Sequence, residues 1–208
     1  MTDLQCPARI ILARHGEAAV PQSGGPRVLT PTGVAQAEAL ADAVDPLRVA
    51  SLWSSTMDRA QQTAAIVSDR LGLPTVHDDR LRELINDERW TPPLCDRDDP
   101  GDVYAAWLEG NLDGTIFGET GHDVVERLRS VVEDVADRCR GEAALLVSHG
   151  GIIELGLTHL CRNITAAFVD SNPLLNGETV GLEVDSSGWV CTSWAGSPLA
   201  ARLGTATR

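Results

Sequence analysis

The sequence contains no lysine, and all 17 of its basic residues are arginine. The chain therefore has no side-chain amine that could form a Schiff base with a carbonyl substrate. It also lacks the lysine that completes a nucleotide-binding phosphate loop. Because 30 acidic residues bring the net charge to -13, an anionic substrate would need a local group of arginines to overcome the surrounding field.

Long apolar runs are also missing. No stretch approaches the roughly 20 residues of a membrane-spanning helix, and residues 1–9 hold no apolar core of a secretion signal. The five cysteines show neither the close spacing of metal ligands nor a disulfide framework. An acidic chain does not favour the broad basic face that nucleic acids require. We therefore expect a cytoplasmic protein with no membrane partner and no nucleic-acid partner.

The length of 208 residues and the hydrophobic fraction of 43% favour a single domain with a full core. Short apolar runs alternate with segments of helical periodicity. The expected strands are residues 8–13, 49–53, 75–83 and 143–147, and the expected helices are residues 31–43, 57–71, 102–109, 124–139 and 152–161. Residues 179–185 and 189–194 predict a hairpin. This order predicts an α/β fold, a three-layer α/β/α sandwich with a mostly parallel central sheet and a C-terminal hairpin.

Residues 1–196 are expected to form this one domain, and residues 197–208 a flexible tail. Residues 85–120 are the least regular part of the domain, with several acids and prolines and one expected short helix. A variable insert of this length can be a lid that decides substrate choice, or a plain surface excursion. The sequence leaves both interpretations open.

Two polar motifs follow expected buried strands directly. Arg14-His15-Gly16 comes at the end of the first strand, and His149-Gly150-Gly151 at the end of the strand that precedes the last long helix. The carboxyl ends of parallel strands meet at one edge of a sheet, so we expect both histidines at that edge. Arg59 lies just beyond another strand, near a helix N-terminus, where anions are attracted.

Arg14, Arg59, His15 and His149 around one point would constrain the chemistry. Each guanidinium can grip a phosphate through two hydrogen bonds, and a neutral imidazole can attack phosphorus. With His149 protonated the pocket would carry about +3 against a phosphoryl group near -2, and phosphoryl transfer depends mainly on positioning and charge neutralisation. The leaving alkoxide still needs a proton. Glu83, at the end of the third expected strand, is the acid best placed to supply it and then to activate water.

Five segments of the chain, taken in their order along the sequence, carry a resemblance to a known family. They are Leu12-Ala13-Arg14-His15-Gly16-Glu17, Leu29 to Ala37, Ser54 to Ala64, Leu81-Arg82-Glu83, and Val147-Ser148-His149-Gly150-Gly151. Together they resemble the histidine phosphatase superfamily, the group that includes phosphoglycerate mutase-like enzymes. Gly118-Glu119-Thr120 is similar to a further family element ahead of a long helix. The resemblance covers about residues 8–185.

The resemblance implies a role for each of these side chains. His15 would become the phosphohistidine, and Glu83 would give and take the proton. Arg14, Arg59 and His149 would hold the phosphoryl group. Gly150 is expected to join them in the phosphate site, and Ser23 either donates a backbone N–H to phosphate or only forms part of a turn. Neither a metal nor a cofactor is expected.

The chain also departs from the family pattern. Ala18-Ala19-Val20-Pro21 follow Glu17, where the family often has serine or threonine and then asparagine, and this argues against a cofactor-dependent mutase. Gly151 stands where the resembling mutases tend to carry asparagine, and glycine there favours the phosphatase branch. The residues after Glu83 lack the usual pattern, so Asp87 and Glu88 are rival acids.

The sequence therefore predicts a metal-independent phosphomonoesterase that acts through a phosphohistidine on a small phosphorylated metabolite. A phosphoglycerate-type mutase and a catalytically silent, phosphate-binding regulatory protein are the alternatives. Residues 85–120 are expected to decide the substrate, which the sequence does not name. A homodimer that uses the edge of the terminal hairpin is a further open alternative.

Overall fold

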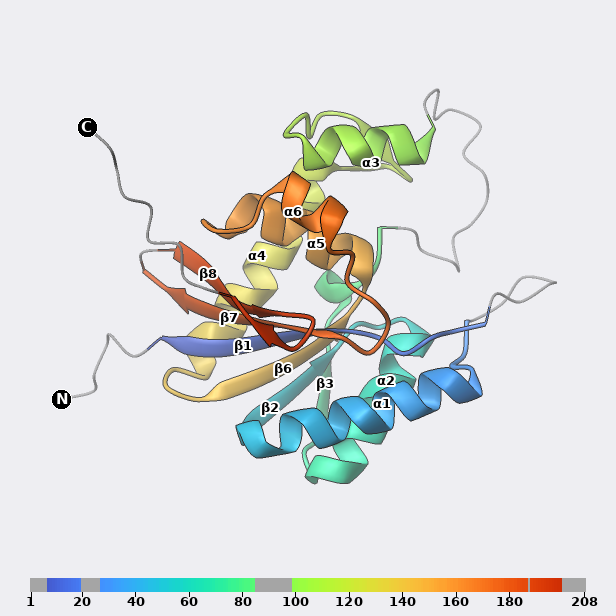
Figure 1. The fold of residues 1–208 in the computed structure, drawn as a ribbon, viewed down its shortest axis with the longest axis vertical. Helices are drawn as coiled ribbons and strands as arrows, with labels where there is room; N and C mark the ends of the chain where they lie inside the picture. Colours follow the sequence, from blue (N-terminus) through green and yellow to red (C-terminus); the bar gives the residue numbers. More distant parts are fainter. Residues whose placement is uncertain (1–6, 20–26, 85–98, 187, 200–208) are drawn as a thin grey trace.

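One seven-stranded sheet forms the centre of the fold (Figure 1). The structure is a computed structural model that describes residues 7–19, 27–84, 99–186 and 188–199. The strands of the sheet are β1 (Ala8–Arg14), β2 (Val49–Ser54), β3 (Thr75–His77), β6 (Ala143–Ser148), β7 (Thr179–Asp185), β8 (Gly188–Trp194) and β9 (Ser197–Pro198). Their order is β3-β2-β6-β1-β7-β8-β9. The first four in this order run parallel, and the hairpin of β7 and β8 extends the sheet in antiparallel fashion, as predicted.

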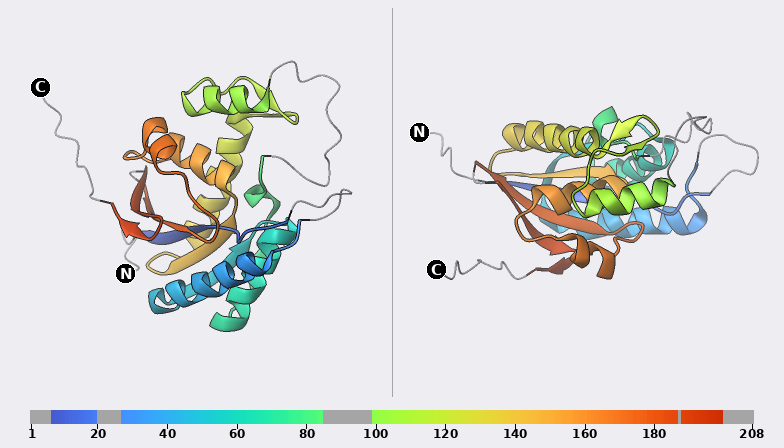
Figure 2. Two further views of the ribbon diagram at one scale, coloured as in Figure 1. Left: turned by 45° about the vertical axis from the view of Figure 1, so that its right-hand side comes forward. Right: turned by 90° about the horizontal axis from the view of Figure 1, so that it is seen from above.

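Helices cover both faces of this sheet (Figures 1 and 2). They are α1 (Pro31–Val44), α2 (Asp58–Leu71), α3 (Pro100–Leu108), α4 (Gly121–Arg138), α5 (Gly150–Leu160) and α6 (Ala166–Ser171). α1 and α2 lie against one face, and α4 and α5 against the other. The predicted three-layer α/β/α sandwich is therefore confirmed.

Alternation along β1 explains why both faces need cover. Ile10 and Leu12 point into a core shared with α4 and α5, whereas Ile11 and Ala13 point into a smaller core shared with α1 and α2. Successive side chains of a strand point to opposite faces, so a strand that is apolar throughout must be buried on both sides. This arrangement fixes β1 in the middle of the sheet, and its carboxyl end carries the first polar motif.

The strand predicted for residues 75–83 is mostly wrong. β3 ends at His77, and a 3₁₀-helix, η2 (Asp79–Leu81), follows it. The side chain of Asp78 accepts a hydrogen bond of 2.9 Å from the backbone N–H of Arg80, which turns the chain away from the sheet. Glu83 therefore follows a 3₁₀ turn and does not end a strand.

The described part of the variable insert packs onto the domain above α5 (Figure 1). It consists of α3 and a small hairpin of β4 (Thr115–Ile116) and β5 (Glu119–Thr120). The expected short helix is present as α3. Residues 85–98 lie outside the described residues. Ser197–Pro198, assigned to the tail from the sequence, pair with β8 as β9, and the flexibility of the remaining tail stays a prediction.

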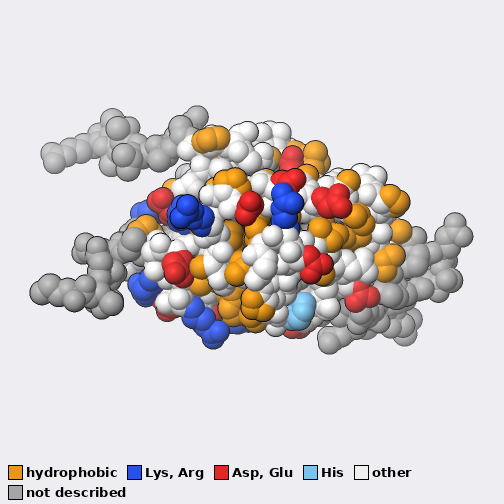
Figure 3. Space-filling model, turned by 90° about the horizontal axis from the view of Figure 1, so that it is seen from below, with side chains coloured by type: hydrophobic (Ala, Val, Ile, Leu, Met, Phe, Trp, Pro, Cys, Tyr) orange, Lys and Arg blue, Asp and Glu red, His pale blue; other side chains and the backbone are white. Residues whose placement is uncertain are grey.

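The surface over α1 and α2 has a mixed charge pattern. Acidic and basic side chains lie beside one another there, with apolar side chains between them (Figure 3). The described basic side chains on that face do not gather into a continuous patch. None of the described helices is both long enough and apolar enough to cross a membrane.

Candidate active site

The two histidines are brought together by adjacent parallel strands. β1 and β6 pair in a register that places Arg14 opposite Ser148, so His15 and His149 follow at the same edge of the sheet. The backbone N–H of His15 donates to the carbonyl of Ser148 over 3.0 Å. The ring centroids of the two histidines lie 5.0 Å apart in an edge-to-face arrangement.

Hydrogen bonds on both ring nitrogens fix the tautomer of His15. Nδ1 lies 2.7 Å from the carbonyl oxygen of Gly16, which can only accept, so Nδ1 carries the proton. Arg59 Nε lies 2.9 Å from Nε2 and can only donate, so Nε2 holds a lone pair. The nucleophilic nitrogen is therefore free of a proton and lies against a guanidinium.

Burial and nearby positive charge keep His15 neutral. Burial is the larger cause that lowers the pKa of His15 to about 3, and the charges of Arg59, Arg14 and Arg27 lower it further. The hydrogen bond to Gly16 acts in the opposite direction. At neutral pH the ring is therefore uncharged beside these arginines, a state in which Nε2 could attack an electrophile.

Two glycines allow the close packing behind His15. A side chain at Gly16 would place its Cβ 2.3 Å from the carbonyl oxygen of Gly33, and a side chain at Gly33 would place its Cβ 2.0 Å from the carbonyl oxygen of Glu17. The N–H of Gly16 also donates to Thr63 Oγ1 on α2 over 3.0 Å. The loop after β1 is thereby held against both α1 and α2.

The arginines approach the nucleophile from two sides. Arg59 lies in the first turn of α2, with 5% of its surface exposed. Arg14 ends β1, and its Nη1 donates to the carbonyl of Leu174 over 2.6 Å. Its Nε is buried and, within the described residues, has no hydrogen-bond partner. An ideal Cβ at Gly150 would lie 3.2 Å from the guanidinium carbon of Arg14, so Gly150 leaves the space that this side chain occupies.

His149 is completely buried, and its environment corrects the charge expected for the pocket. Its Nε2 lies 2.8 Å from Ser55 Oγ, and its Nδ1 has no partner among the described residues. Burial is the largest cause that lowers its pKa well below the usual value, and the neighbouring His15 ring and the charges of Arg59, Arg127 and Arg14 act in the same direction. His149 is therefore neutral, and the positive charge beside it comes from the arginines alone.

Glu83 is held by the N-terminus of α5. Its carboxylate accepts hydrogen bonds from the backbone N–H groups of Gly151 (3.2 Å), Ile152 (3.1 Å) and Leu84 (3.0 Å). The first N–H groups of a helix have no partner within it and attract anions. Glu83 therefore takes the place of a capping side chain, since His149 makes no side-chain cap at this helix.

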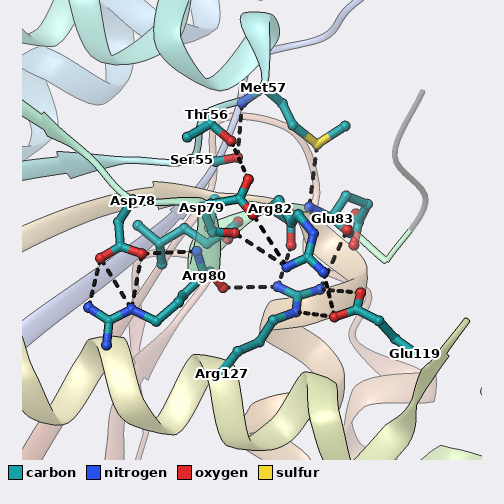
Figure 4. A network of polar contacts seen from close by, with 12 residues as sticks. Ser55, Thr56, Met57, Asp78, Asp79, Arg80, Arg82, Glu83, Glu119 and Arg127 are labelled. Carbon is teal, nitrogen blue, oxygen red and sulfur yellow. Dashed lines mark hydrogen bonds and ion pairs between the residues drawn. The ribbon is translucent and has the colours of Figure 1, made fainter. Parts of the chain in front are cut away.

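Arg127 holds the segment that carries Glu83 from the other side (Figure 4). Its Nη1 donates to the carbonyls of Arg80 (2.9 Å) and Arg82 (2.6 Å). Its Nε pairs with Glu119 of β5 at 3.1 Å, and Arg82 pairs with the same carboxylate at 2.6 Å. The Gly118-Glu119-Thr120 motif thus supplies the charge that neutralises a buried guanidinium beside the proposed acid.

Four of the predicted site residues, Arg14, His15, Arg59 and Glu83, line one cavity of 460 Å³, whereas His149 and Gly150 lie behind its wall and do not line it. It is lined by Arg14, His15, Glu17, Ala18, Arg27, Arg59, Glu83, Leu84, Pro100, Gly101, Tyr104, Ile116, Gly151 and Asn176. Sequence reasoning missed three of its polar lining residues, Arg27, Tyr104 and Asn176. Ser23 and the rival acids Asp87 and Glu88 lie outside the described residues, so their placement stays a prediction.

A larger cavity, of 670 Å³, lies elsewhere in the fold. It is bordered by the last turns of α4 and by the β7–β8 hairpin, with Arg129, Glu133, Asp137 and Trp189 in its wall. None of the residues predicted for the site lines it. The chemistry of the smaller cavity therefore identifies the candidate active site better than size does.

Replacing Gly151 by alanine tests the fit around Glu83. The new Cβ would lie 2.8 Å from Glu83 Oε1, so the carboxylate must move, whereas alanine favours a helix over glycine by about 1 kcal/mol. We expect hydrolysis of an alkyl phosphate to fall by about tenfold or more, with an unchanged or higher melting temperature. Steady-state rates and a thermal melt on the same preparation check this, and an unchanged rate would contradict the proposed contact.

Comparison with known proteins agrees with this geometry. Residues 10–196 match the sequence pattern of the histidine phosphatase superfamily (branch 1). The chain belongs to this superfamily. One relative of this histidine phosphatase superfamily member is the probable phosphoglycerate mutase GpmB of Enterobacter sp. (strain 638). The two sequences are 29% identical over 202 residues, and the match covers 89% of each chain.

Solved structures of the superfamily share the fold. A mycobacterial glucosyl-3-phosphoglycerate phosphatase in complex with VO3 is 26% identical, with a TM-score of 0.69 over 89% of this chain and 98% of that one. A phosphoserine phosphatase from Entamoeba histolytica in complex with 3-phosphoglyceric acid is 21% identical, with a TM-score of 0.69 over 90% of this chain and 96% of that one, and shows the likeness of the fold alone. The relatives thus include both mutase and phosphatase names.

Proposed function

We propose that the protein is a phosphomonoesterase that transfers a phosphoryl group from a small phosphorylated metabolite first to His15 and then to water, without a metal. The observation that carries this proposal is the state of His15. Its Nε2 is unprotonated, lies 2.9 Å from Arg59 Nε, and faces the cavity that Glu83 also lines. Nucleophile, anion-binding groups and acid thus share one pocket of a size that suits a small metabolite.

In the first step the Nε2–P bond forms as the P–O bond of the ester breaks. Glu83, protonated at this stage, gives its proton to the leaving oxygen, and the alcohol departs. The hydrogen bond of Nδ1 to the carbonyl of Gly16 stabilises the phosphorylated ring. Arg14 and Arg59 hold the oxygens of the transferring group, and their charges compensate the charge on those oxygens.

In the second step water attacks the phosphohistidine. Glu83, now a carboxylate, takes a proton from the water as the new O–P bond forms and the Nε2–P bond breaks. Inorganic phosphate leaves, and both His15 and Glu83 return to their starting states. The backbone N–H groups that hold Glu83 keep its carboxyl group at one place for both proton transfers.

The mutase alternative has a specific observation in its favour, the probable phosphoglycerate mutase name of relatives that share 29% identity. A mutase would return the phosphoryl group from His15 to a second hydroxyl of the same molecule. The name glucosyl-3-phosphoglycerate phosphatase among similar structures supports the hydrolytic reading instead. We give hydrolysis priority because Gly151 leaves its space to the carboxylate of Glu83, the group proposed to activate water.

Phosphate release in the presence of EDTA tests the proposed function. We expect the wild-type protein to release inorganic phosphate from a panel of phosphorylated sugars, glycerates and amino acids, at a rate that EDTA does not change. Phosphorus NMR of the same reactions separates the alternatives, because a mutase isomerises 3-phosphoglycerate with little free phosphate. Binding of vanadate without turnover of any substrate would instead support a silent binding protein.

A further inference from the structure

Tyr104 links the variable insert to the proposed acid. It lies on α3, is partly buried, and lines the same cavity as His15 and Glu83. Its ring packs edge-on against Trp107, with 6.5 Å between the ring centroids. The side chain is therefore held by the insert itself, with its hydroxyl at the far end available to the domain below.

That hydroxyl reaches the peptide that binds Glu83. Tyr104 Oη donates to the carbonyl oxygen of Gly151 over 2.9 Å, and the N–H of the same peptide group, that of Ile152, donates to Glu83 Oε1 over 3.1 Å. The N–H of Gly151 itself donates to Glu83 Oε2 over 3.2 Å. Burial, with Glu154 and Glu83 nearby, raises the pKa of Tyr104 well above its usual value, so the hydroxyl stays protonated and remains a donor. One residue of α5 thus receives a hydrogen bond from the insert and gives one to the acid.

No capping side chain of its own N-cap residue holds the first turn of α5. Gly151 has no side chain, and the N-cap residue His149 makes no capping hydrogen bond with its side chain. The peptide between Gly151 and Ile152 contacts the hydroxyl of Tyr104 through its C=O and the carboxylate of Glu83 through its N–H. A shift of this peptide would move the carboxyl group that transfers the proton, and small misplacements of reacting groups are costly.

We propose that Tyr104 is a positioning residue for Glu83, so that the insert that lines the substrate cavity also sets the geometry of proton donation. This rests on the proposed function. A substrate that displaces α3 would move the acid with it, and a substrate that packs well against Tyr104, Ile116 and Leu84 would fix the acid for transfer. Substrate choice and the efficiency of leaving-group protonation are thereby coupled through one hydroxyl.

The replacement Tyr104→Phe, combined with two kinds of leaving group, tests this proposal. An alkyl phosphate such as glycerol 3-phosphate leaves as a basic alkoxide and needs the proton, whereas 4-nitrophenyl phosphate leaves as a weakly basic phenolate. The ratio kcat/KM reports the steps up to departure of the leaving group, so it separates proton donation by Glu83 from its later role as a base for water. We expect kcat/KM for the alkyl phosphate to fall by about 10- to 100-fold and kcat/KM for the aryl phosphate to change by less than about threefold. A merely structural role would lower both rates alike, and that result would overturn the proposal.

A second arm uses Glu83→Gln, which removes the proton donor. Tyr104→Phe is expected to add less than about a twofold loss in this background, because two residues that act through one group are not additive. Thr158→Val is the matched control. It removes a hydroxyl that donates to the backbone carbonyl of Glu154 over 2.8 Å, farther along α5, and it should leave both rates unchanged. An equal loss from Tyr104→Phe with and without Glu83 would refute the positioning role.

The proposal and the proposed function fail in distinguishable ways. If the wild type turns over in EDTA but Glu83→Gln lowers kcat/KM equally for both leaving groups, Glu83 is not the proton donor, and the role of Tyr104 falls while the phosphatase remains. If the wild type releases no phosphate from any substrate, the function itself is refuted. Thermal melts of all variants exclude loss of the fold as the cause of a lower rate.

Discussion

Replacing His15 by alanine is expected to abolish phosphate release, with kcat at least about 10⁴-fold lower than in the wild type. The reason is that no other described side chain presents an unprotonated nitrogen to the same pocket in the same way. His149, the only other histidine beside it, is completely buried and its Nε2 is engaged by Ser55. Discontinuous assays with inorganic phosphate detection measure losses of this size.

The expected loss must be separated from a loss of structure, because 7% of His15 is exposed and its ring fills part of the pocket. The matched control is His122→Ala, which removes an exposed histidine whose nearest charged partner, Asp113, is exposed as well. We expect that variant to keep the wild-type rate and melting temperature. Wild-type turnover by the His15→Ala protein would eliminate the phosphohistidine mechanism.

Trapping the intermediate gives a direct view of the same step. Rapid acid-free quenching of the wild type with ³²P-labelled substrate should leave label on the protein that base preserves and acid removes, as expected for phosphohistidine. The His15→Ala protein should carry none. Label on a different residue would place the nucleophile elsewhere, even if the variant were inactive.

The site could be predicted from sequence where it depends on strand ends. Arg14-His15 and His149 each follow an apolar run directly, and the parallel register of β1 and β6 then brings the two rings to 5.0 Å. The start of α1 could be predicted from the sequence for a similar local reason. Thr30 accepts a hydrogen bond of 3.0 Å from the N–H of Gly33, as its position before a proline at the first helical residue predicts.

Features that depend on packing between distant segments could not be predicted. Arg127 lies on an amphipathic helix, where an arginine usually faces solvent, but its guanidinium binds backbone carbonyls of residues 80–82 that lie far away in sequence. The contact of Tyr104 with Gly151 likewise depends on how the insert folds back over α5. No periodicity or motif encodes either contact.

The protonation state of His149 could not be predicted from the sequence either. The residue types allowed a protonated His149, and with it a pocket of about +3. Complete burial next to two arginines makes the neutral ring the stable form instead. The strand predicted for residues 75–83 was mostly wrong, for a local reason that only the structure shows. The side chain of Asp78 accepts a hydrogen bond from the N–H of Arg80, and this bond competes with strand pairing.

The replacement Arg59→Met is expected to lower kcat/KM by about 10³-fold, because it removes a buried donor that lines the cavity and is proposed to hold the transferred phosphoryl group. Arg59 Nε is the group against Nε2 of His15, at 2.9 Å, and its side chain is 5% exposed, so water cannot readily substitute for its charge. Affinity for vanadate should fall as well. Arg70→Met on the same helix is the matched control, since that arginine is exposed and pairs with Asp42 on the surface.

The same variant makes a prediction with a definite sign in pH. The charge of Arg59 is one cause of the low pKa of His15, about 3, although burial is the larger one. Removing that charge must raise this pKa, so the protonated, non-nucleophilic ring appears at a higher pH than in the wild type. The ratio of wild-type to variant rates should therefore grow as the pH falls toward 4, and NMR titration of the His15 ring should show the upward shift. The charge of Arg59 and the hydrogen bond that it donates to Nε2 both favour the neutral ring, so a downward shift would contradict this role of Arg59.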